Sequence, residues 1–113
     1  MGKYEPEDID PTICTHVVYA FVALDPVNFI MKPTDKFVDQ TFYQKITALK
    51  SRGVKVTIGL GGWLDSTEKY SKMVNNPAAR KKFVRHAVNF IEQNNFDGLD
   101  LDWEYPRCWQ VSW

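Results

Sequence analysis

The sequence has no excess of charge, no long apolar run and almost no cysteine. Its 14 Lys plus Arg residues balance 14 Asp plus Glu residues, so the formal net charge is zero. A neutral chain with mixed signs offers no electrostatic footprint for nucleic acid or anionic lipid, and neither is expected as a partner. The longest apolar run, from Val17 to Leu24, is far shorter than the roughly 20 residues that a membrane-spanning helix needs.

The first residues also lack an apolar signal segment, since Met1 to Pro6 are mostly polar. Only two cysteines occur, Cys14 and Cys108, and they stand far apart. They could pair, stay buried as free thiols or each have lost a partner, so they do not identify a redox compartment. Nothing in the sequence indicates an oligomeric state.

Aromatic residues, by contrast, are abundant: four Trp, five Tyr and seven Phe make up 14% of the 113 residues. Hydrophobic residues account for 44% and charged residues for 25%, as in ordinary globular proteins. The length allows one domain at most. The aromatic side chains could fill a core, or they could form a surface that stacks on flat ligands such as sugar rings.

Residues 16–24, 54–60 and 97–104 are predicted to be strands. The first is a continuous run rich in Val and aromatics, which is the pattern of a strand buried on both faces. Asp25-Pro26 breaks this run, and residues 25–37 are predicted to be irregular.

Helical patterns separate the strands. Apolar residues at helical spacing predict a helix over residues 39–51, with Gly53 as its C-terminal cap. A capping box formed by Asp65 and Glu68 predicts a short helix that ends near position 74. Asn76-Pro77 then opens a longer helix, which ends near position 94.

The order β–α–β–α–β predicts an α/β fold in which right-handed crossovers join parallel strands. Strands recur about every forty residues, and a (β/α)₈ barrel of roughly 250 residues uses such a unit eight times. Three strands could form a small α/β layer or a piece of a barrel. The acidic motif in the last strand decides between them.

That motif is a row of acids within residues 97–104. Because side chains alternate along a strand, Asp100, Asp102 and Glu104 share one face. Neighbouring acids on this face would lie about 6.5 to 7 Å apart. Carboxylates this close should share protons, and one that is kept protonated could act as a general acid. Glu104 stands at the C-terminal end of the strand, where (β/α)₈ enzymes place catalytic groups.

The spacing alone leaves two alternatives open. The acids could hold Mg²⁺ or Ca²⁺, which prefer carboxylate oxygens, or they could form a structural network. The side chain of Asp97 falls on the opposite face of the strand from these acids, and Asp97 is interpreted as a strand-entry residue. Trp103 also points away from the acids and is predicted to pack against a helix.

Residues 97–106 resemble the catalytic signature of glycoside hydrolase family 18, the chitinases. The family pattern is Asp-x-x-Asp-x-Asp-x-Glu on the fourth strand of a (β/α)₈ barrel. Residues 14–21 and 56–63 resemble the family's second and third strands, and residues 105–111 are most similar to arthropod chitinases. The resemblance implies a partial (β/α)₈ TIM barrel that covers about strands two to four, with residues 1–113 as a fragment of a catalytic domain.

The same resemblance implies roles for the acids. Glu104 would protonate the glycosidic oxygen, and the substrate's own 2-acetamido carbonyl would act as the nucleophile. Asp102 would hydrogen-bond the acetamido N–H, and Asp100 would sit behind Asp102 and share its proton. The outcome is hydrolysis of β-1,4-linked N-acetylglucosamine with retention. Neither a metal nor an organic cofactor is implied, which favours acid catalysis over the metal alternative.

Several aromatic residues are candidates for sugar contacts. Tyr19 and Phe21 are predicted to lie on one face of their strand, where they could line the site or belong to the core. Gly62 and Trp63 follow the next strand at its C-terminal end, and Trp63 could be a subsite wall or a packing residue. Tyr105 is adjacent to Glu104 and could reach the sugar. No role is assigned to Trp109 and Trp113.

The sequence departs from the family in places. Strand three of the family reads Ser-x-Gly-Gly, whereas residues 59–62 here read Gly-Leu-Gly-Gly, so the hydroxyl that would bond Asp100 is absent. The family's first strand and strands five to eight are missing from the chain. In the family, the first strand would bring a cysteine that pairs with Cys14, and Cys108 is expected to have lost a partner beyond Trp113.

The best interpretation is therefore part of a chitinase catalytic domain, inactive when isolated, from an extracellular parent protein that acts on chitin or chito-oligosaccharides. One alternative is a chitinase-like lectin that binds these sugars without cleavage. Such relatives typically lose the acid at the position of Glu104, which this chain keeps. Another alternative is a gene fragment without function.

Overall fold

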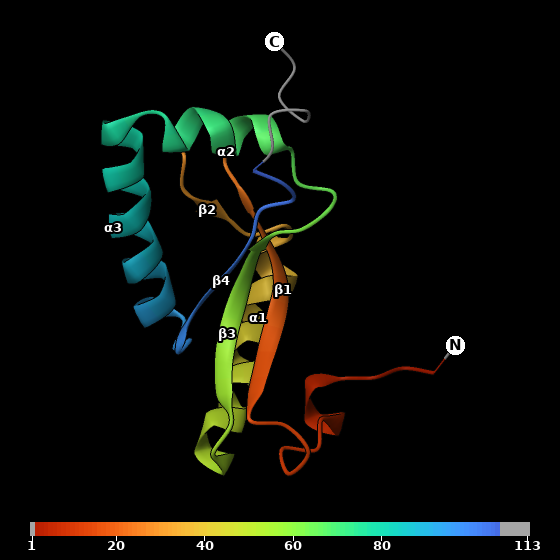
Figure 1. Cartoon of the computed structure of the whole chain (residues 1–113). Coiled ribbons are helices and arrows are strands. Elements are labelled where there is room, and N and C mark those ends of the chain that lie inside the picture. Colours follow the sequence, from red (N-terminus) through yellow and green to blue (C-terminus); the bar gives the residue numbers. More distant parts are fainter. Residues whose placement is uncertain (1, 107–113) are drawn as a thin grey trace.

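The structure is a computed structural model that describes residues 2–106. Four strands form one sheet in the order β2-β1-β3-β4 (Figure 1). The parallel strands are β1 (His16–Leu24), β3 (Lys55–Gly61) and β4 (Gly98–Asp102), and short β2 (Met31–Lys32) pairs antiparallel with the end of β1. The parallel strands stand side by side in sequence order, as consecutive βα units require.

Among residues 2–106, three α-helices and one of two 3₁₀ helices connect the strands. In Figure 1, α1 lies behind β1 and β3, α3 runs beside β4, and α2 crosses the end of the sheet at which the parallel strands finish. Helix α1 is continued by the 3₁₀ helix η2, and η1 precedes the sheet. Their bounds are Pro6–Asp8 for η1, Lys36–Thr47 for α1, Ala48–Arg52 for η2, Thr67–Val74 for α2 and Pro77–Gln93 for α3.

Local chemistry explains where these helices begin and end. The Asp35 carboxylate accepts hydrogen bonds from the amides of the second and third residues of α1, and the Asn76 side-chain oxygen does the same for α3. Gly53 ends η2 with a φ of +87°, a conformation that disfavours side chains. The predicted start at Asn76-Pro77 and the predicted Gly53 cap are therefore confirmed.

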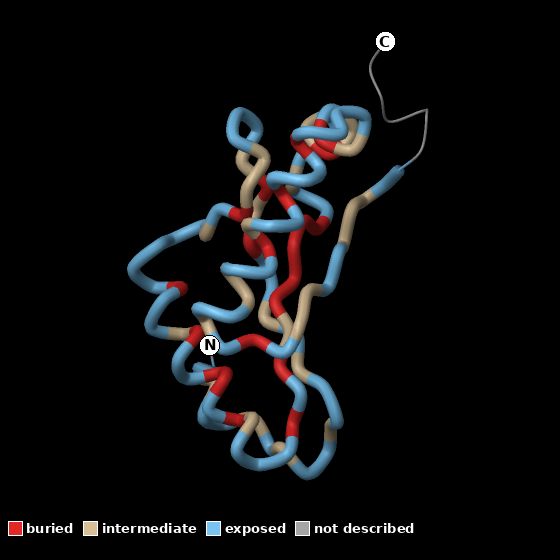
Figure 2. Tube along the Cα trace, turned by 90° about the vertical axis from the view of Figure 1, so that its left-hand side faces the viewer, coloured by how far each residue is buried: buried red, intermediate tan, exposed pale blue. Residues whose placement is uncertain are grey.

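The core lies between the sheet and the helices. Val56, Ile58 and Leu60 alternate along β3 and are completely buried, and each such side chain stabilises the fold by about 1.5–3 kcal/mol. The helices cover them with buried apolar residues that recur at helical spacing: Tyr43, Ile46, Leu49, Tyr70, Met73, Ala79, Phe83 and Ala87. In Figure 2 the strand that leads to the C-terminal end, β4, is intermediate or exposed throughout.

Several predictions about the elements were wrong. The strand predicted over residues 97–104 ends at Asp102, and β1 is not buried on both faces, since Val18 and Phe21 are exposed. Residues 25–37 are not wholly irregular, because Met31–Lys32 forms β2 against the end of β1. The capping box of Asp65 and Glu68 does not form, because the N-cap of α2 is Ser66, whose side chain makes no cap hydrogen bond. The Asp65 side chain instead reaches across the fold to the backbone of Leu24. Among residues 2–106, no helix is long and apolar enough to cross a membrane.

Candidate active site

The two acids of β4, Asp100 and Asp102, have glycines as their neighbours on the adjacent strand β3. In the parallel register Asp100 pairs with Gly59 and Asp102 pairs with Gly61. Paired residues of adjacent strands point to the same face of the sheet, so both acids have a glycine as their neighbour. Glu104 follows two residues beyond Asp102, in a bend after β4 has ended. Asp100 is exposed, whereas Asp102 and Glu104 are half-buried.

Gly61 is required by how closely β3 approaches β4. Its φ is +110°, and a Cβ at this position would overlap the carbonyl oxygen of Asp102. The next amide, that of Gly62, donates a 2.8 Å hydrogen bond to the same carbonyl oxygen. The backbone of Asp102 is thus fixed from the neighbouring strand, while its side chain remains on the open face.

Tyr19 and Phe21 do not share a face, so this prediction was wrong. The pairing of β1 with β3 shifts register between Ala20 and Val22, which breaks the alternation on which the prediction relied. The Tyr19 hydroxyl donates a 2.9 Å hydrogen bond to buried Asp39 in α1. Burial, together with this carboxylate, raises the pKa of Tyr19 to about 12. Tyr19 therefore belongs to the helix-covered side and is withdrawn as a sugar contact.

Phe21 turns to the side of the acids. Its ring lies over two glycines of the neighbouring segment, since a Cβ on Gly59 would be 3.2 Å from its Cδ1 and a Cβ on Gly62 would be 2.8 Å from its Cε2. The Phe21 carbonyl accepts a hydrogen bond of 3.0 Å from the Thr34 hydroxyl. The side chain is 41% exposed, so its ring is available to a ligand.

A pocket of about 410 Å³ opens next to Phe21. Gly62 and Trp63 line it, together with the end of β1 and Asp65. The Trp63 side chain is 70% exposed, and its ring meets that of Tyr105 edge-on at 6.3 Å between centroids. The predicted residues Phe21, Gly62 and Trp63 are thus brought together, and Tyr105 adjoins them through Trp63.

Trp103 packs against α2, as its parity predicted. Its indole ring stacks on Tyr70 with 5.8 Å between centroids, and its Nε1 donates a 2.6 Å hydrogen bond to the Thr67 hydroxyl. The Thr67 hydroxyl also lies 3.3 Å from the carbonyl oxygen of Tyr105. Contacts from α2 therefore hold both neighbours of Glu104, the side chain of Trp103 and the backbone carbonyl of Tyr105.

Asp97 stands at the entry to β4, as expected. Its carboxylate accepts a 2.8 Å hydrogen bond from the amide of Val56, and its own amide donates to the Val56 carbonyl. The first of these bonds, aided by Lys50 nearby, holds the pKa of Asp97 below its usual range. Asp97 therefore helps to fix the register of β4 against β3, and it lies at the opposite end of β4 from Asp102.

The remaining predictions concern metals and cysteines. No group of three or more His, Cys, Asp or Glu side chains in residues 2–106 is arranged to hold a metal ion. Cys14 is a half-buried free thiol whose sulfur lies 3.9 Å from the carbonyl oxygen of Asp10. Cys108, Trp109 and Trp113 lie outside the described residues.

Known proteins resemble the chain in sequence and in structure. "Probable chitinase 10" of Drosophila melanogaster is 52% identical over 114 residues, covering 98% of this chain and 5% of the relative. Catalytic domain 2 of the Ostrinia furnacalis Group II chitinase is 60% identical in a crystal structure with a TM-score of 0.91, covering 97% of this chain and 30% of that one. A chitinase-like agglutinin from Robinia pseudoacacia is 33% identical with a TM-score of 0.79, covering 91% and 32%.

The chain spans 5% and 23% of the lengths of the first two curated relatives. The match nevertheless extends over nearly all of the chain, and the model of one family, Glycosyl hydrolases family 18, covers residues 1–110. The predicted α/β fold and partial (β/α)₈ barrel are confirmed by the parallel β1-β3-β4 order and by these structural relatives. The chain belongs to glycosyl hydrolase family 18.

Proposed function

We propose that residues 1–113 are part of a chitinase catalytic domain and carry its acid catalyst. The substrate class is chitin or chito-oligosaccharides, that is, β-1,4-linked N-acetylglucosamine. One observation carries the proposal: Asp100 and Asp102 stand on the edge strand β4 beside Gly59 and Gly61, and Glu104 follows two residues beyond the strand end. Family membership supports it, as does the crystal structure of a mutant of the Ostrinia domain in complex with (NAG)5.

In the proposed reaction the protein supplies the proton and the substrate supplies the nucleophile. Glu104 gives its proton to the glycosidic oxygen as the bond to the anomeric carbon breaks. The oxygen of the 2-acetamido carbonyl forms a bond to that carbon, and water later opens the resulting ring, which gives overall retention. Asp102 accepts a hydrogen bond from the acetamido N–H and offsets the positive charge of the intermediate. Asp100 lies one step behind Asp102 and shares its proton.

The aromatic residues form the proposed binding surface. Phe21 and Trp63 flank the pocket at the C-terminal end of the sheet, and the Tyr105 ring extends this surface from the residue after Glu104. Faces of sugar rings are apolar and pack well on aromatic rings. Gly62 lets the Phe21 ring lie directly against its backbone. We further propose that the parent protein is extracellular, where chitin is found.

The test is a Glu104→Gln variant of the full-length protein that contains this chain. This change keeps the shape of the side chain and removes the proton that can be transferred. Hydrolysis of a chromogenic chito-oligosaccharide should fall by about 10²- to 10⁴-fold, whereas binding of the uncleaved sugar should persist. Glu92→Gln, an exposed carboxylate on α3, is the matched control and should be fully active. Equal turnover of the Glu104 and Glu92 variants would remove Glu104 from the proposed role.

The second candidate is a lectin that binds chito-oligosaccharides without cleaving them. Two observations favour it: the likeness to the Robinia agglutinin and Gly59, which replaces the family's serine beside Asp100. Isothermal titration with chitopentaose, followed by chromatography of the mixture, separates the two candidates. An intact ligand after prolonged incubation with the wild-type protein would favour the lectin.

A further inference from the structure

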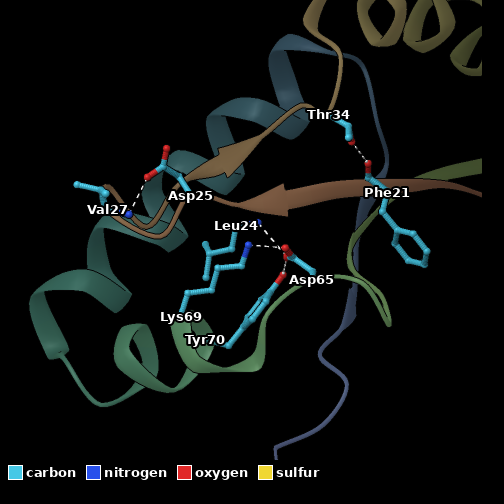
Figure 3. A network of polar contacts seen from close by, with 8 residues as sticks. All are labelled: Phe21, Leu24, Asp25, Val27, Thr34, Asp65, Lys69 and Tyr70. Atoms are coloured by element: carbon cyan, nitrogen blue, oxygen red, sulfur yellow. Dashed lines mark hydrogen bonds and ion pairs between the residues drawn. The ribbon is translucent and has the colours of Figure 1, made fainter. Parts of the chain in front are cut away.

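Asp65 makes contacts that neither the acid motif nor the helix pattern requires. One carboxylate oxygen, Oδ2, accepts 3.1 Å and 2.6 Å hydrogen bonds from the Leu24 amide and the Tyr70 hydroxyl. The other oxygen, Oδ1, pairs with the Lys69 ammonium. Figure 3 shows these donors converging on Asp65 from the end of β1 and from α2. One side chain therefore joins three segments: β1, the loop 62–66 and α2.

Burial makes this carboxylate dependent on its partners. The Asp65 side chain is 10% exposed and that of Lys69 is 14% exposed. A charge with so little water around it is stable only when it is paired and hydrogen-bonded. The same segment holds a second i,i+4 pair, Glu68–Lys72, whose side chains are 57% and 63% exposed and whose contribution is correspondingly small.

The loop between the two anchored ends is itself exposed. At one end the Gly62 amide donates to the Asp102 carbonyl, and at the other the Asp65 amide donates to the Gly62 carbonyl at 3.0 Å. Between them, Trp63 is 70% exposed and Leu64 is 97% exposed. The loop therefore gains little from burial of its own side chains, and its position depends on the anchors at Gly62 and Asp65.

The same anchor reaches the residues that follow β4 through an aromatic ring. Tyr70, which donates its hydroxyl proton to Asp65, stacks on Trp103, the residue between Asp102 and the bend at Glu104. Burial raises the pKa of the Tyr70 hydroxyl, with Asp65 adding to the effect, so the hydroxyl remains a neutral donor. Through Tyr70, the contacts of Asp65 thus extend to Trp103, whereas the pocket itself is lined by Asp65 and the loop that it holds.

We propose that Asp65 is a positioning residue for sugar binding: its buried carboxylate holds the loop 62–66, and with it Trp63, in the orientation that binds the saccharide. This inference rests on the chitinase function proposed above. Asp65 does not touch the reacting atoms, and it acts through Trp63. If the loop is released, only a fraction of molecules is competent to bind, and the apparent Kd rises by the inverse of that fraction.

Two variants of the full-length protein test the anchor, with one matched control. Asp65→Asn keeps the shape but removes the charge and places an amide N–H₂ opposite a donor. Tyr70→Phe deletes one hydroxyl and keeps the ring that stacks on Trp103. It therefore still tests the anchor if Asp65→Asn fails to fold. Glu68→Gln removes the exposed carboxylate of the neighbouring pair and serves as the control.

The readouts separate positioning from chemistry and from folding. For both test variants we expect the Kd and KM for chitopentaose to rise by about tenfold, with kcat within about twofold of wild type. Hydrogen exchange of the Leu24 amide and of the loop 62–66 should accelerate in the same variants, and Glu68→Gln should match wild type in every measurement. Unchanged exchange, or a loss of kcat at constant KM, would overturn the inference. If wild type neither binds nor cleaves the sugar, the proposed function fails, while the exchange measurement still decides the anchoring of the loop.

Discussion

Replacing Gly61 by alanine should damage the fold more than the same change at Gly53 or Gly98. Two costs add at this position. The φ of +110° disfavours a Cβ, which costs about 1–2 kcal/mol. The new methyl would also overlap the Asp102 carbonyl and lie 3.2 Å from the Tyr70 hydroxyl, and overpacking of this kind costs about 1–3 kcal/mol. The expected loss for Gly61→Ala is therefore about 2–5 kcal/mol.

The two other glycines separate these costs. Gly53 has a φ of +87°, and no atom lies within 4 Å of the place that a Cβ would take, so Gly53→Ala carries the conformational cost alone. Gly98 has an ordinary φ, and a Cβ there would meet only the Thr57 methyl at 3.7 Å. Gly98→Ala should therefore be neutral, or stabilising by about 0.4–1 kcal/mol through the unfolded chain.

Urea unfolding of the three variants of the full-length protein gives the comparison. The free energy of unfolding should fall in the order Gly98→Ala, Gly53→Ala, Gly61→Ala. Because the clash falls on the backbone of Asp102, the proposed chitinase activity should be lost only in Gly61→Ala under conditions in which all three variants remain folded. Equal stability of the Gly61 and Gly53 variants would show that β3 and β4 can separate without cost, and the close approach would then have no role in holding Asp102.

Three further outcomes follow from the structure. Gly59→Ser should place a hydroxyl beside Asp100 and raise kcat by up to about tenfold, while KM rises because Phe21 must yield to a Cβ only 3.2 Å away; constant kcat and KM would contradict this. The pKa of Asp97 is lowered in the folded state, so its contribution to stability is present above the unfolded pKa of about 3.9 and is lost as the pH falls through the folded pKa. Asp97→Asn should therefore make the free energy of unfolding less dependent on pH in the acid range. A curve of the same shape, only shifted in free energy, would refute this prediction. Residues 1–113 expressed alone should show no chitinase turnover, because Val18, Phe21 and Leu101 are exposed apolar residues on an open sheet; measurable cleavage of a chromogenic substrate by a soluble monomer would refute the prediction.

Local patterns in the sequence predicted the strands and the long helix well. The strand 16–24 has the predicted bounds, and α3 begins at Asn76-Pro77 because a side-chain cap and a proline act within one turn. The acids of β4 were also predictable, since alternation needs only the neighbouring residues. The identity of the family came from the motif over residues 97–106, which is itself a local pattern.

Contacts between distant residues were the source of the errors. Asp65 has the spacing of a capping box with Glu68, but its carboxylate is bound by an amide 41 residues away in the sequence. Tyr19 and Phe21 have the spacing of one face, but the register shift against β3 puts them on opposite sides. Short β2 has too few residues to form a pattern and exists only because the end of β1 pairs with it.

The parallel strands pair in the order in which a ribosome makes them. Synthesis adds about 5–20 residues per second, whereas a short loop closes in well under a millisecond. During translation β3 can therefore settle against β1 before β4 has emerged. When Asp100 and Asp102 leave the ribosome, the glycines beside which they lie have already been made, so we expect these negative charges to come together only after β1 and β3 have paired.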